Sequence, residues 1–368
     1  MPFSVKTLDV LLHVQDPGAA NFVAPLPAAL ERRSITSKLI ATGLAMDYFS
    51  RRGIVHQEVD HASASRLLDE LSPQLVLVGT SENRESVDLA LIAECRAKHI
   101  TCAAAIDMNV NERLRFAGTS ADPLRFMPDW LLVTDEATQK KYAALGIDKS
   151  RIAIVGHPHF DYVVETRAHF ESSPTASLRA KYGLPLNRQV ILFAAEPHSA
   201  INPESTSKNS RFTMNGFSGN SQSSVIALEE LITAISKLEK KPFLAVKLHP
   251  KNRPEEFEHL VQIDQVIGQA DPLEVAWCAD VVAGVGSMLL EESHLLGIPT
   301  VSISPSVTAC QHWLACIASG EVDCVNDPNL LPQALSELLS RDRRTTIAEP
   351  AIPRVVEFIR GQLQTVSP

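Results

Sequence analysis

Short apolar segments alternate with helical patterns along almost the whole chain, and this alternation restricts the fold more than any other feature of the sequence. In the first half, segments of strand length are separated by segments in which apolar residues recur at helical spacing. Several strand candidates, such as LVLV at 75–78 and AAAI at 103–106, are apolar on both faces, as parallel strands covered by helices are. The pattern predicts a doubly wound α/β domain.

The same alternation resumes after a polar segment that contains Pro and Ser. We therefore expect two facing, doubly wound, Rossmann-like α/β domains, the first over 1–170 and the second over 189–368, with a linker at 171–188 and a C-terminal helix. The polar loop at 197–221 is longer than ordinary connections. The expected strands are 8–14, 37–42, 74–79, 101–106, 130–134, 151–155, 190–195, 243–248, 280–284 and 300–304. The expected helices are 19–33, 45–52, 64–71, 85–98, 136–145, 224–238, 255–261, 288–296, 331–340 and 354–362.

The composition of the chain excludes several classes of protein. Its 368 residues, with 45% hydrophobic and 21% charged, are typical of a soluble globular protein with sizeable cores. A net charge of −9 argues against general nucleic-acid binding. We see no signal peptide and no apolar run near ~18 residues that could span a membrane. None of the six cysteines forms a C-x-x-C pair, which favours buried free thiols over disulfides or zinc and predicts a cytoplasmic protein.

Ligands of open α/β sheets bind at the carboxyl ends of the strands, so the residues that follow each strand are the site candidates. In the first domain the turn QDPGAAN opens a helix, and its residues Gly18 and Asn21 suit close approach by a substrate. Asp16 is the first candidate for a catalytic base, with His157 and Asp107 behind it. The structural alternatives are a helix cap for Asp16, a buried turn for Asp107, and packing for His157.

In the second domain, polar residues again follow the strands. Glu196 and His198 come directly after one strand candidate, and alternation places Lys247 and His249 on the same side at the end of the next. Cationic and donor side chains at this place suit a diphosphate. The alternative for Lys247 and His249 is a surface lysine beside a histidine with an ordinary hydrogen-bond partner.

The segment 279–304 reads as a strand, a turn of small residues, an apolar helix and a second strand. At the turn, Gly286 and Ser287 leave main-chain N–H groups able to approach an anion at the helix start. Glu291 and Glu292 lie one helical turn further on, where a carboxylate can reach sugar hydroxyls beside that anion. A turn for phosphate and an acid for ribose together indicate a nucleotide-type ligand.

The nine residues EESHLLGIP at 291–299 resemble the E-E-A-x-x-L-G-x-P segment of UDP-N-acetylglucosamine 2-epimerases and the related segment of MurG-type glycosyltransferases. In those families the glutamate five residues before the glycine holds the ribose hydroxyls, and the preceding turn contacts the phosphates. The resemblance therefore implies the GT-B architecture, with Glu292 on the ribose and Gly286 and Ser287 on the phosphates. LHP at 248–250 is similar to the H-P motif of CDP-glycerol polymer transferases.

These residues together predict a glycosyltransferase of polysaccharide biosynthesis. It would move a sugar from a nucleoside diphosphate sugar, held by the second domain, to a cell-surface polysaccharide or lipid-linked acceptor held near Gly18 and Asn21. No cofactor is indicated. The chain has no D-x-D motif, and His157 and His159 have no third ligand nearby, so a metal is not indicated either.

Three alternatives stay open. The first is a nucleotide-sugar epimerase or hydrolase, although the chain lacks the arginine and glutamate of the epimerase turn G-T-R-P-E. The second is a glycerophosphotransferase of the CDP-glycerol type, and the third is a non-catalytic module that binds nucleotide sugars. A homodimer and a peripheral contact with a membrane are compatible with the glycosyltransferase prediction.

Overall fold

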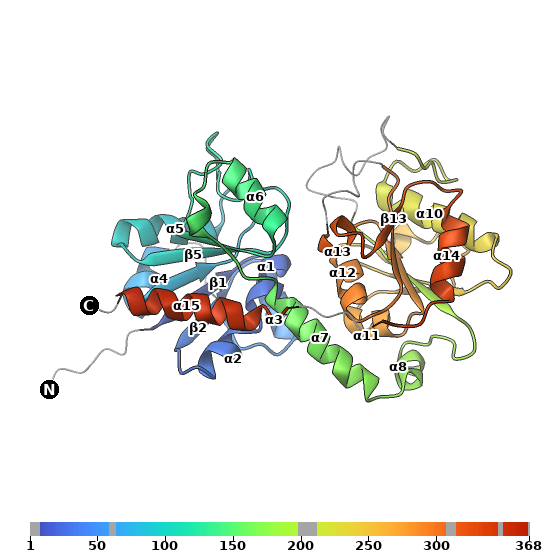
Figure 1. Ribbon diagram of the computed structural model, residues 1–368, viewed down its shortest axis with the longest axis horizontal. Helices are drawn as coiled ribbons and strands as arrows, with labels where there is room; N and C mark the ends of the chain where they lie inside the picture. Colours follow the sequence, from blue (N-terminus) through green and yellow to red (C-terminus); the bar gives the residue numbers. More distant parts are fainter. Residues whose placement is uncertain (1–7, 59–63, 198–211, 307–313, 345–348, 367–368) are drawn as a thin grey trace. The chain divides into compact units, whose positions relative to one another are not determined.

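The computed structural model describes residues 8–58, 64–197, 212–306, 314–344 and 349–366. Its contacts divide the chain into two compact units, Met1–Tyr162 with Glu349–Pro368, and Val163–Ala348. Each unit is a parallel β-sheet covered by helices, as the alternation predicts (Figure 1). No helix within the described ranges is both long enough and apolar enough to cross a bilayer.

In its described part the first unit has a seven-stranded parallel sheet with the order β3-β2-β1-β4-β5-β6-β7. The strands are β1 (Val10–Val14), β2 (Ser37–Ala41), β3 (Gln57–Glu58), β4 (Leu75–Val78), β5 (Thr101–Ile106), β6 (Trp130–Val133) and β7 (Ile152–Ile154). The helices are α1 (Pro17–Val23), α2 (Leu26–Glu31), α3 (Leu44–Arg51), α4 (Ala64–Leu71), α5 (Val87–Lys98), α6 (Glu136–Ala144) and α15 (Ile352–Val366). A short 3-10 helix, η2 (Lys149–Arg151), precedes β7.

Neighbouring residues of each strand enter opposite cores, which is why the strands are apolar on both faces. Leu12 and Leu77 pack with α1, α2, α3 and α15, whereas Leu11 and Val76 pack with α4, α5 and α6. The red helix α15 accordingly lies beside the blue helix α2 in Figure 1.

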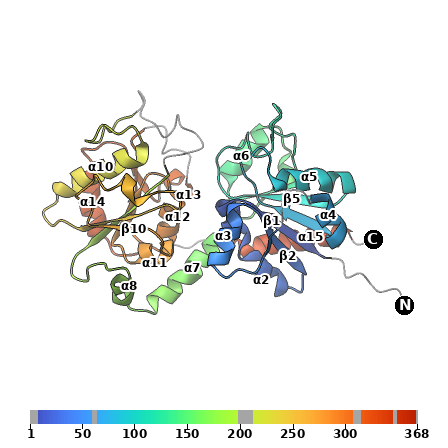
Figure 2. The same cartoon turned by 180° about the vertical axis from the view of Figure 1, so that it is seen from behind.

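The described part of the second unit has a six-stranded parallel sheet with the order β10-β9-β8-β11-β12-β13. The strands are β8 (Val190–Ala194), β9 (Phe243–Lys247), β10 (Gln265–Ile267), β11 (Val281–Gly284), β12 (Thr300–Ile303) and β13 (Asp323–Val325). The helices are α7 (Pro158–Glu171), α8 (Thr175–Lys181), α10 (Ser223–Ser236), η3 (Pro254–Glu256), α11 (Pro272–Trp277), α12 (Met288–Leu295), α13 (Ala315–Ala318) and α14 (Leu331–Leu339), the first turn of α7 belonging to the other unit. Figures 1 and 2 show α10 and α14 on one side of this sheet and α11 and α12 on the other.

Several features differ from the sequence-based expectations, and the strands β3, β10 and β13 and the helices α11 and α13 are not among the expected elements. The helix expected at 19–33 is broken into α1 and α2 around Pro25, because proline lacks the N–H that a continuous helix needs. The expected linker contains α8. The helix expected at 255–261 is only the single turn η3. The C-terminal helix α15 belongs to the first unit, where Val355 and Ile359 are fully buried in the core, so the chain returns to its first unit at its end.

The cysteines only partly match the expectation of free thiols. Cys95, Cys102, Cys278 and Cys316 are buried and free. Cys324 takes part in a disulfide, so the expectation is wrong for that residue.

Candidate functional site

In the described part of each sheet the strand order reverses at one point, and the helices that follow the two strands there go to opposite faces. In the first sheet this switch point lies between β1, followed by α1, and β4, followed by α5. In the second it lies between β8, followed by α10, and β11, followed by α12. Because the two helices diverge there, a crevice opens at the carboxyl ends of the strands. The turn after β1, Glu196 and the Gly286–Ser287 turn all stand at these switch points.

Glu196 and the Gly286–Ser287 turn meet because β8 and β11 are neighbours in register. Ala194 of β8 pairs with Gly284 of β11, so the residues two positions further on leave the sheet side by side. The Gly286 N–H donates to Glu196 Oε1 at 2.5 Å, and the Ser287 N–H bonds the same carboxylate. Burial raises the pKa of Glu196 to about 7, although the two N–H groups act in the opposite direction.

Lys247 and His249 stand at the end of β9, where the sequence placed them, but their polar atoms have protein partners. Lys247 Nζ donates to the carbonyl oxygens of Leu248 at 2.9 Å and Gly268 at 2.7 Å, and burial lowers its pKa. His249 Nδ1 accepts from the Lys251 N–H at 3.1 Å. Burial, assisted by Lys251 and Lys247, lowers the pKa of His249 to about 4, so the ring is neutral at pH 7. His198 lies outside the described residues.

The two glutamates of α12 have different surroundings. Ser287 caps the helix, its Oγ accepting from the Leu289 N–H at 3.4 Å. The buried carboxylate of Glu291 accepts from the Cys316 N–H at 3.0 Å, and burial raises the pKa of Glu291. Glu291 therefore anchors the start of α13. Glu292 is also buried, one residue further along the helix.

In the first unit, Asp107 directly follows β5 and forms a buried ion pair that the sequence does not predict. Arg115 Nη1 donates to Asp107 Oδ1 at 2.7 Å and to Thr80 Oγ1 at 2.6 Å, and both charged side chains are almost fully enclosed. Thr80 in turn donates to the Ala105 carbonyl oxygen at 2.9 Å. A buried aspartate requires a cation or several donors, and the basic residues of the loop after β5 were the signal for this pair.

Gly18 lies against the Asp107 carboxylate. A Cβ at position 18 would stand 2.1 Å from Asp107 Oδ2, closer than any real contact, so a larger residue at this position requires the Asp107 carboxylate to move. We expect Gly18→Ala to lower the free energy of unfolding of the first unit by about 1–3 kcal/mol, because the ion pair must move. Urea unfolding measures this. Gly268→Ala, which meets nothing within 4 Å, is the control and should stay near the parent.

Two other candidate site residues of the first unit, His157 and Asn21, have contacts with neighbouring side chains. His157 is buried beside Phe22 and stacks on Phe160 with ring centroids 4.8 Å apart. Burial, with His159, lowers the pKa of His157 to about 3, so the ring is neutral at pH 7. Asn21 Oδ1 accepts from the Tyr48 hydroxyl, which joins α1 to α3. Packing therefore accounts for His157 and Asn21 as they stand.

Asp16 occupies the N-cap position of α1, but its side chain does not cap the helix. Its main-chain carbonyl accepts from the Ala20 N–H at 2.9 Å, which is the ordinary first bond of α1. The side chain is half-buried at the switch point. The role of Asp16 as a catalytic base stays a prediction.

A buried polar chain beside the same switch point was missed from the sequence. His13 Nδ1 bonds Asp88 Oδ1 at 2.6 Å, and His13 Nε2 bonds Thr42 Oγ1 at 3.3 Å. All three residues are buried. A histidine inside the apolar strand VLLHV was the only sequence signal. These three hydrogen-bonded side chains join β1, the end of β2 and α5, and so stiffen the sheet under the turn that carries Asp16.

Comparison with known proteins separates fold from activity. No family model and no curated protein matches the sequence. Among solved structures, the UDP-GlcNAc 2-epimerase of Methanocaldococcus jannaschii has a TM-score of 0.67 at 14% identity, over 96% of this chain and 100% of that one. The chain has the GT-B fold.

Two further GT-B structures match over nearly the whole chain. The UDP-GlcNAc 2-epimerase of Neisseria meningitidis bound to UDP-GlcNAc has a TM-score of 0.64 at 15% identity, over 97% of this chain and 100% of that one. A glycosyltransferase of Rickettsia africae has a TM-score of 0.58 at 13% identity, over 98% of this chain and 94% of that one. The predicted architecture is therefore confirmed. No matched family or curated protein supports the H-P motif resemblance.

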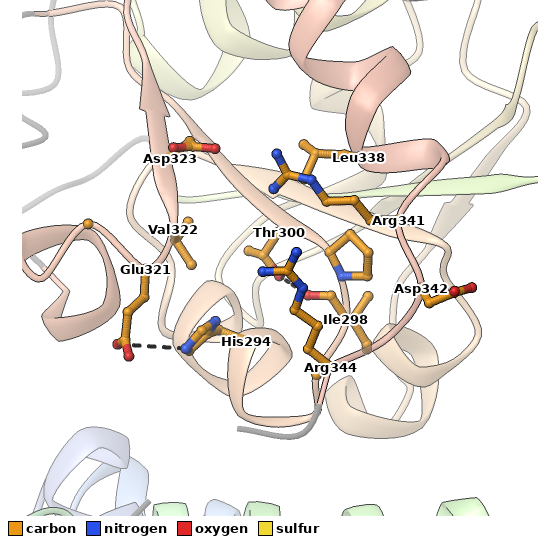
Figure 3. A pocket seen from close by; sticks show the side chains of 13 residues that line it. His294, Ile298, Thr300, Glu321, Val322, Asp323, Leu338, Arg341, Asp342 and Arg344 are labelled. Carbon is orange, nitrogen blue, oxygen red and sulfur yellow. Dashed lines mark hydrogen bonds and ion pairs between the residues drawn. The ribbon is translucent and has the colours of Figure 1, made fainter. Parts of the chain in front are cut away.

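A separate hollow of about 670 Å³ lies at the opposite edge of the second sheet, where β12 and β13 begin (Figure 3). Arg341 and Arg344 direct their guanidinium groups over it, while Glu321 turns toward His294, whose Nε2 is 3.7 Å from the Glu321 carboxylate. Asp323 also lines it. Because both signs of charge line this hollow, it favours no single class of ligand, and the candidate site of this GT-B chain stays at the carboxyl edge.

Proposed function

We propose that this chain is a GT-B enzyme that holds a nucleoside diphosphate sugar at the switch point of the second sheet and transfers the sugar to an acceptor hydroxyl. The observation that carries the proposal is the Gly286–Ser287 turn, whose main-chain N–H groups already hold an anionic group, the carboxylate of Glu196. A phosphate is the ligand that such a turn at the start of an eight-residue helix favours. The similar structures include proteins described as bound to UDP-GlcNAc and to UDP.

The donor site follows from the contacts of each residue. The N–H groups of Gly286 and Ser287 would bond the phosphates, and the neutral ring of His249 would add a hydrogen bond rather than a charge. Glu292 would bond the ribose hydroxyls. Lys247 would act mainly through the two carbonyl oxygens that it holds at the end of β9.

The reaction would break the bond between C1 of the sugar and the diphosphate oxygen, with the electron pair leaving on the diphosphate. Main-chain N–H groups at the turn would stabilise this developing charge. On the first unit, Asp16 would accept the proton of the acceptor hydroxyl as the new bond to C1 forms. Asp107 is ion-paired with Arg115, and the buried ring of His157 resists protonation, so both rank behind Asp16.

Epimerisation or hydrolysis of the same donor is the second candidate, and the epimerases among the similar structures favour it. Both candidates begin with loss of the diphosphate, so the product decides between them. Incubation with UDP-, GDP- and CDP-sugars, with and without glycan and lipid-linked acceptors, should release the nucleoside diphosphate only when an acceptor is present. Turnover or a C2-epimerised sugar without any acceptor would instead establish the second candidate.

Substitution of Glu292 tests the ribose contact. We expect Glu292→Ala to weaken nucleotide-sugar binding by roughly 1.5–3 kcal/mol, about 10- to 150-fold in Kd, because a charge-assisted hydrogen bond is lost. Calorimetry measures the change. Glu321→Ala, an exposed carboxylate near the far end of α12, should leave Kd at the parent value. An unchanged Kd in Glu292→Ala would remove the ribose assignment.

A further inference from the structure

We propose that Glu196 makes binding at the Gly286–Ser287 turn proton-linked, so that the diphosphate enters together with one proton held by the Glu196 carboxyl group. This inference rests on the proposed function, because it concerns the same turn. The balance is simple: ionised protein, diphosphate and a proton combine to give a complex in which Glu196 is neutral.

The Glu196 carboxylate and a bound phosphate would compete for the same two main-chain N–H groups. Glu196 Oε1 accepts the Gly286 N–H at 2.5 Å, and the Ser287 N–H bonds the same carboxylate. These are the two donors that a phosphate would need. An ionised carboxylate and a phosphate at one turn repel each other, whereas a protonated carboxyl group can donate its O–H to a phosphate oxygen.

Contacts of its main chain fix Glu196 beside the turn. The Glu196 N–H donates to Ser224 Oγ at 3.1 Å, and the Glu196 carbonyl oxygen accepts from Asn252 Nδ2 at 3.1 Å. Pairing of β8 with β11 fixes the strand that precedes it. The main chain of Glu196 is therefore held at the turn by three elements, which keeps the carboxyl group within reach of a bound phosphate, and protonation would remove its charge there.

The neighbouring titratable groups do not substitute for that proton. On the β9 side these groups are Lys247, His249 and Glu256, the last of which accepts from the Asn252 amide at 2.8 Å. The pKa of Glu196 is set by burial and two main-chain N–H groups, and none of these three side chains contributes. From α10 and α12 the groups in contact are the neutral Ser224, Gly286 and Ser287.

The proton is available near neutral pH, since burial raises the pKa of Glu196 to about 7. Below this pH the free protein already carries the proton, and binding takes up almost none. Above it, binding must draw one proton from solution, so Kd rises about tenfold for each pH unit. A site that needs a charged histidine or lysine would also weaken as the pH rises, so the Glu196→Gln variant is what assigns the proton to Glu196.

Calorimetry in two buffers of different ionisation enthalpy measures this proton uptake directly. The probe is the tightest binder among UDP-, GDP- and CDP-sugars, because the diphosphate of a nucleotide sugar does not itself titrate near neutral pH. From about pH 6 to about pH 9 we expect uptake to rise from near zero toward one proton. Glu196→Gln should abolish the uptake, flatten Kd against pH, and bind about tenfold more tightly than the parent at about pH 8.

Glu230→Gln is the matched control, because Glu230 also accepts two main-chain N–H groups, those of Asn215 at 3.2 Å and Gly216 at 2.9 Å. It should retain the parent's uptake. Binding without proton uptake in the parent, or uptake that persists in Glu196→Gln, would overturn the inference and leave the proposed function standing. If no nucleotide sugar binds at any pH, the proposed function fails and the inference fails with it.

Discussion

Replacing Arg115 by methionine will lower the free energy of unfolding of the first unit by about 3–5 kcal/mol, since it leaves the Asp107 carboxylate buried without its cation. The two side chains are 5% and 8% exposed, too little for water to replace the lost partner. Methionine keeps the length of the stem and removes the donors to Asp107 and Thr80. Urea unfolding, followed by hydrogen exchange of peptides from β5, measures the loss.

Two variants sharpen this prediction. Arg113→Met changes an exposed arginine of the same loop and should cost little. Arg115→Met combined with Asp107→Leu should recover part of the loss, because the stranded charge is removed together with its partner. Equal stabilities of the Arg113 and Arg115 variants would show that the ion pair does not hold the loop.

Gly297→Ala will lower the free energy of unfolding of the second unit by about 2–4 kcal/mol, because backbone strain and a steric clash add. Gly297 ends α12 at a φ of +77°, and a Cβ there would stand 1.9 Å from the Arg344 carbonyl oxygen. Arg344 cannot retreat freely, because its N–H donates to the Gly297 carbonyl oxygen at 3.0 Å. Urea unfolding, read from peptides of α12, reports the change.

Gly320→Ala separates the two causes of that loss. Gly320 has almost the same φ, +79°, and a Cβ added to it would meet nothing within 4 Å. Its substitution should therefore cost only about 1 kcal/mol, which is the strain of the left-handed backbone alone. If the two variants lose equal stability, the contact with Arg344 contributes nothing.

The sequence predicts the fold well because the fold depends on local patterns. Strands such as LVLV at 75–78 are apolar at every position, so the sequence alone indicates that both faces are buried. Each expected strand lies within one or two residues of its expected place. The expectations fail where a contact distant in sequence decides. The helix α15 packs through Val355 and Ile359 on a core built by residues more than two hundred positions earlier, and no local pattern encodes that return.

The site is less predictable, because a sequence motif identifies residues but not the groups with which they form hydrogen bonds in the folded protein. The resemblance singles out Glu292, but it does not indicate the role of Glu291, which accepts from the Cys316 N–H at the start of α13. Lys247 looks like a phosphate ligand until the carbonyl oxygens of Leu248 and Gly268 are seen to hold it. In each case at least one partner, Cys316 or Gly268, comes from another segment.

Buried ion pairs and polar chains show the same limit. Arg115 lies in a loop with no motif, and it becomes important only because folding encloses it with Asp107. His13 and Asp88 are 75 positions apart and meet only when β1 and α5 pack. The switch point of each sheet, by contrast, follows from strand order, so the region of the site can be predicted better than its chemistry.

The central claim is that a nucleotide sugar binds at the switch point of the second sheet, and hydrogen exchange of the bound protein tests it most directly. Addition of the tightest-binding nucleotide sugar should slow exchange in the peptide that contains Gly286 and Ser287 and in the peptide that contains Glu196. Glu292→Ala should weaken this protection at equal ligand concentration. Binding that protects only the hollow around Arg341 and Arg344, with no change at the turn, would contradict the account.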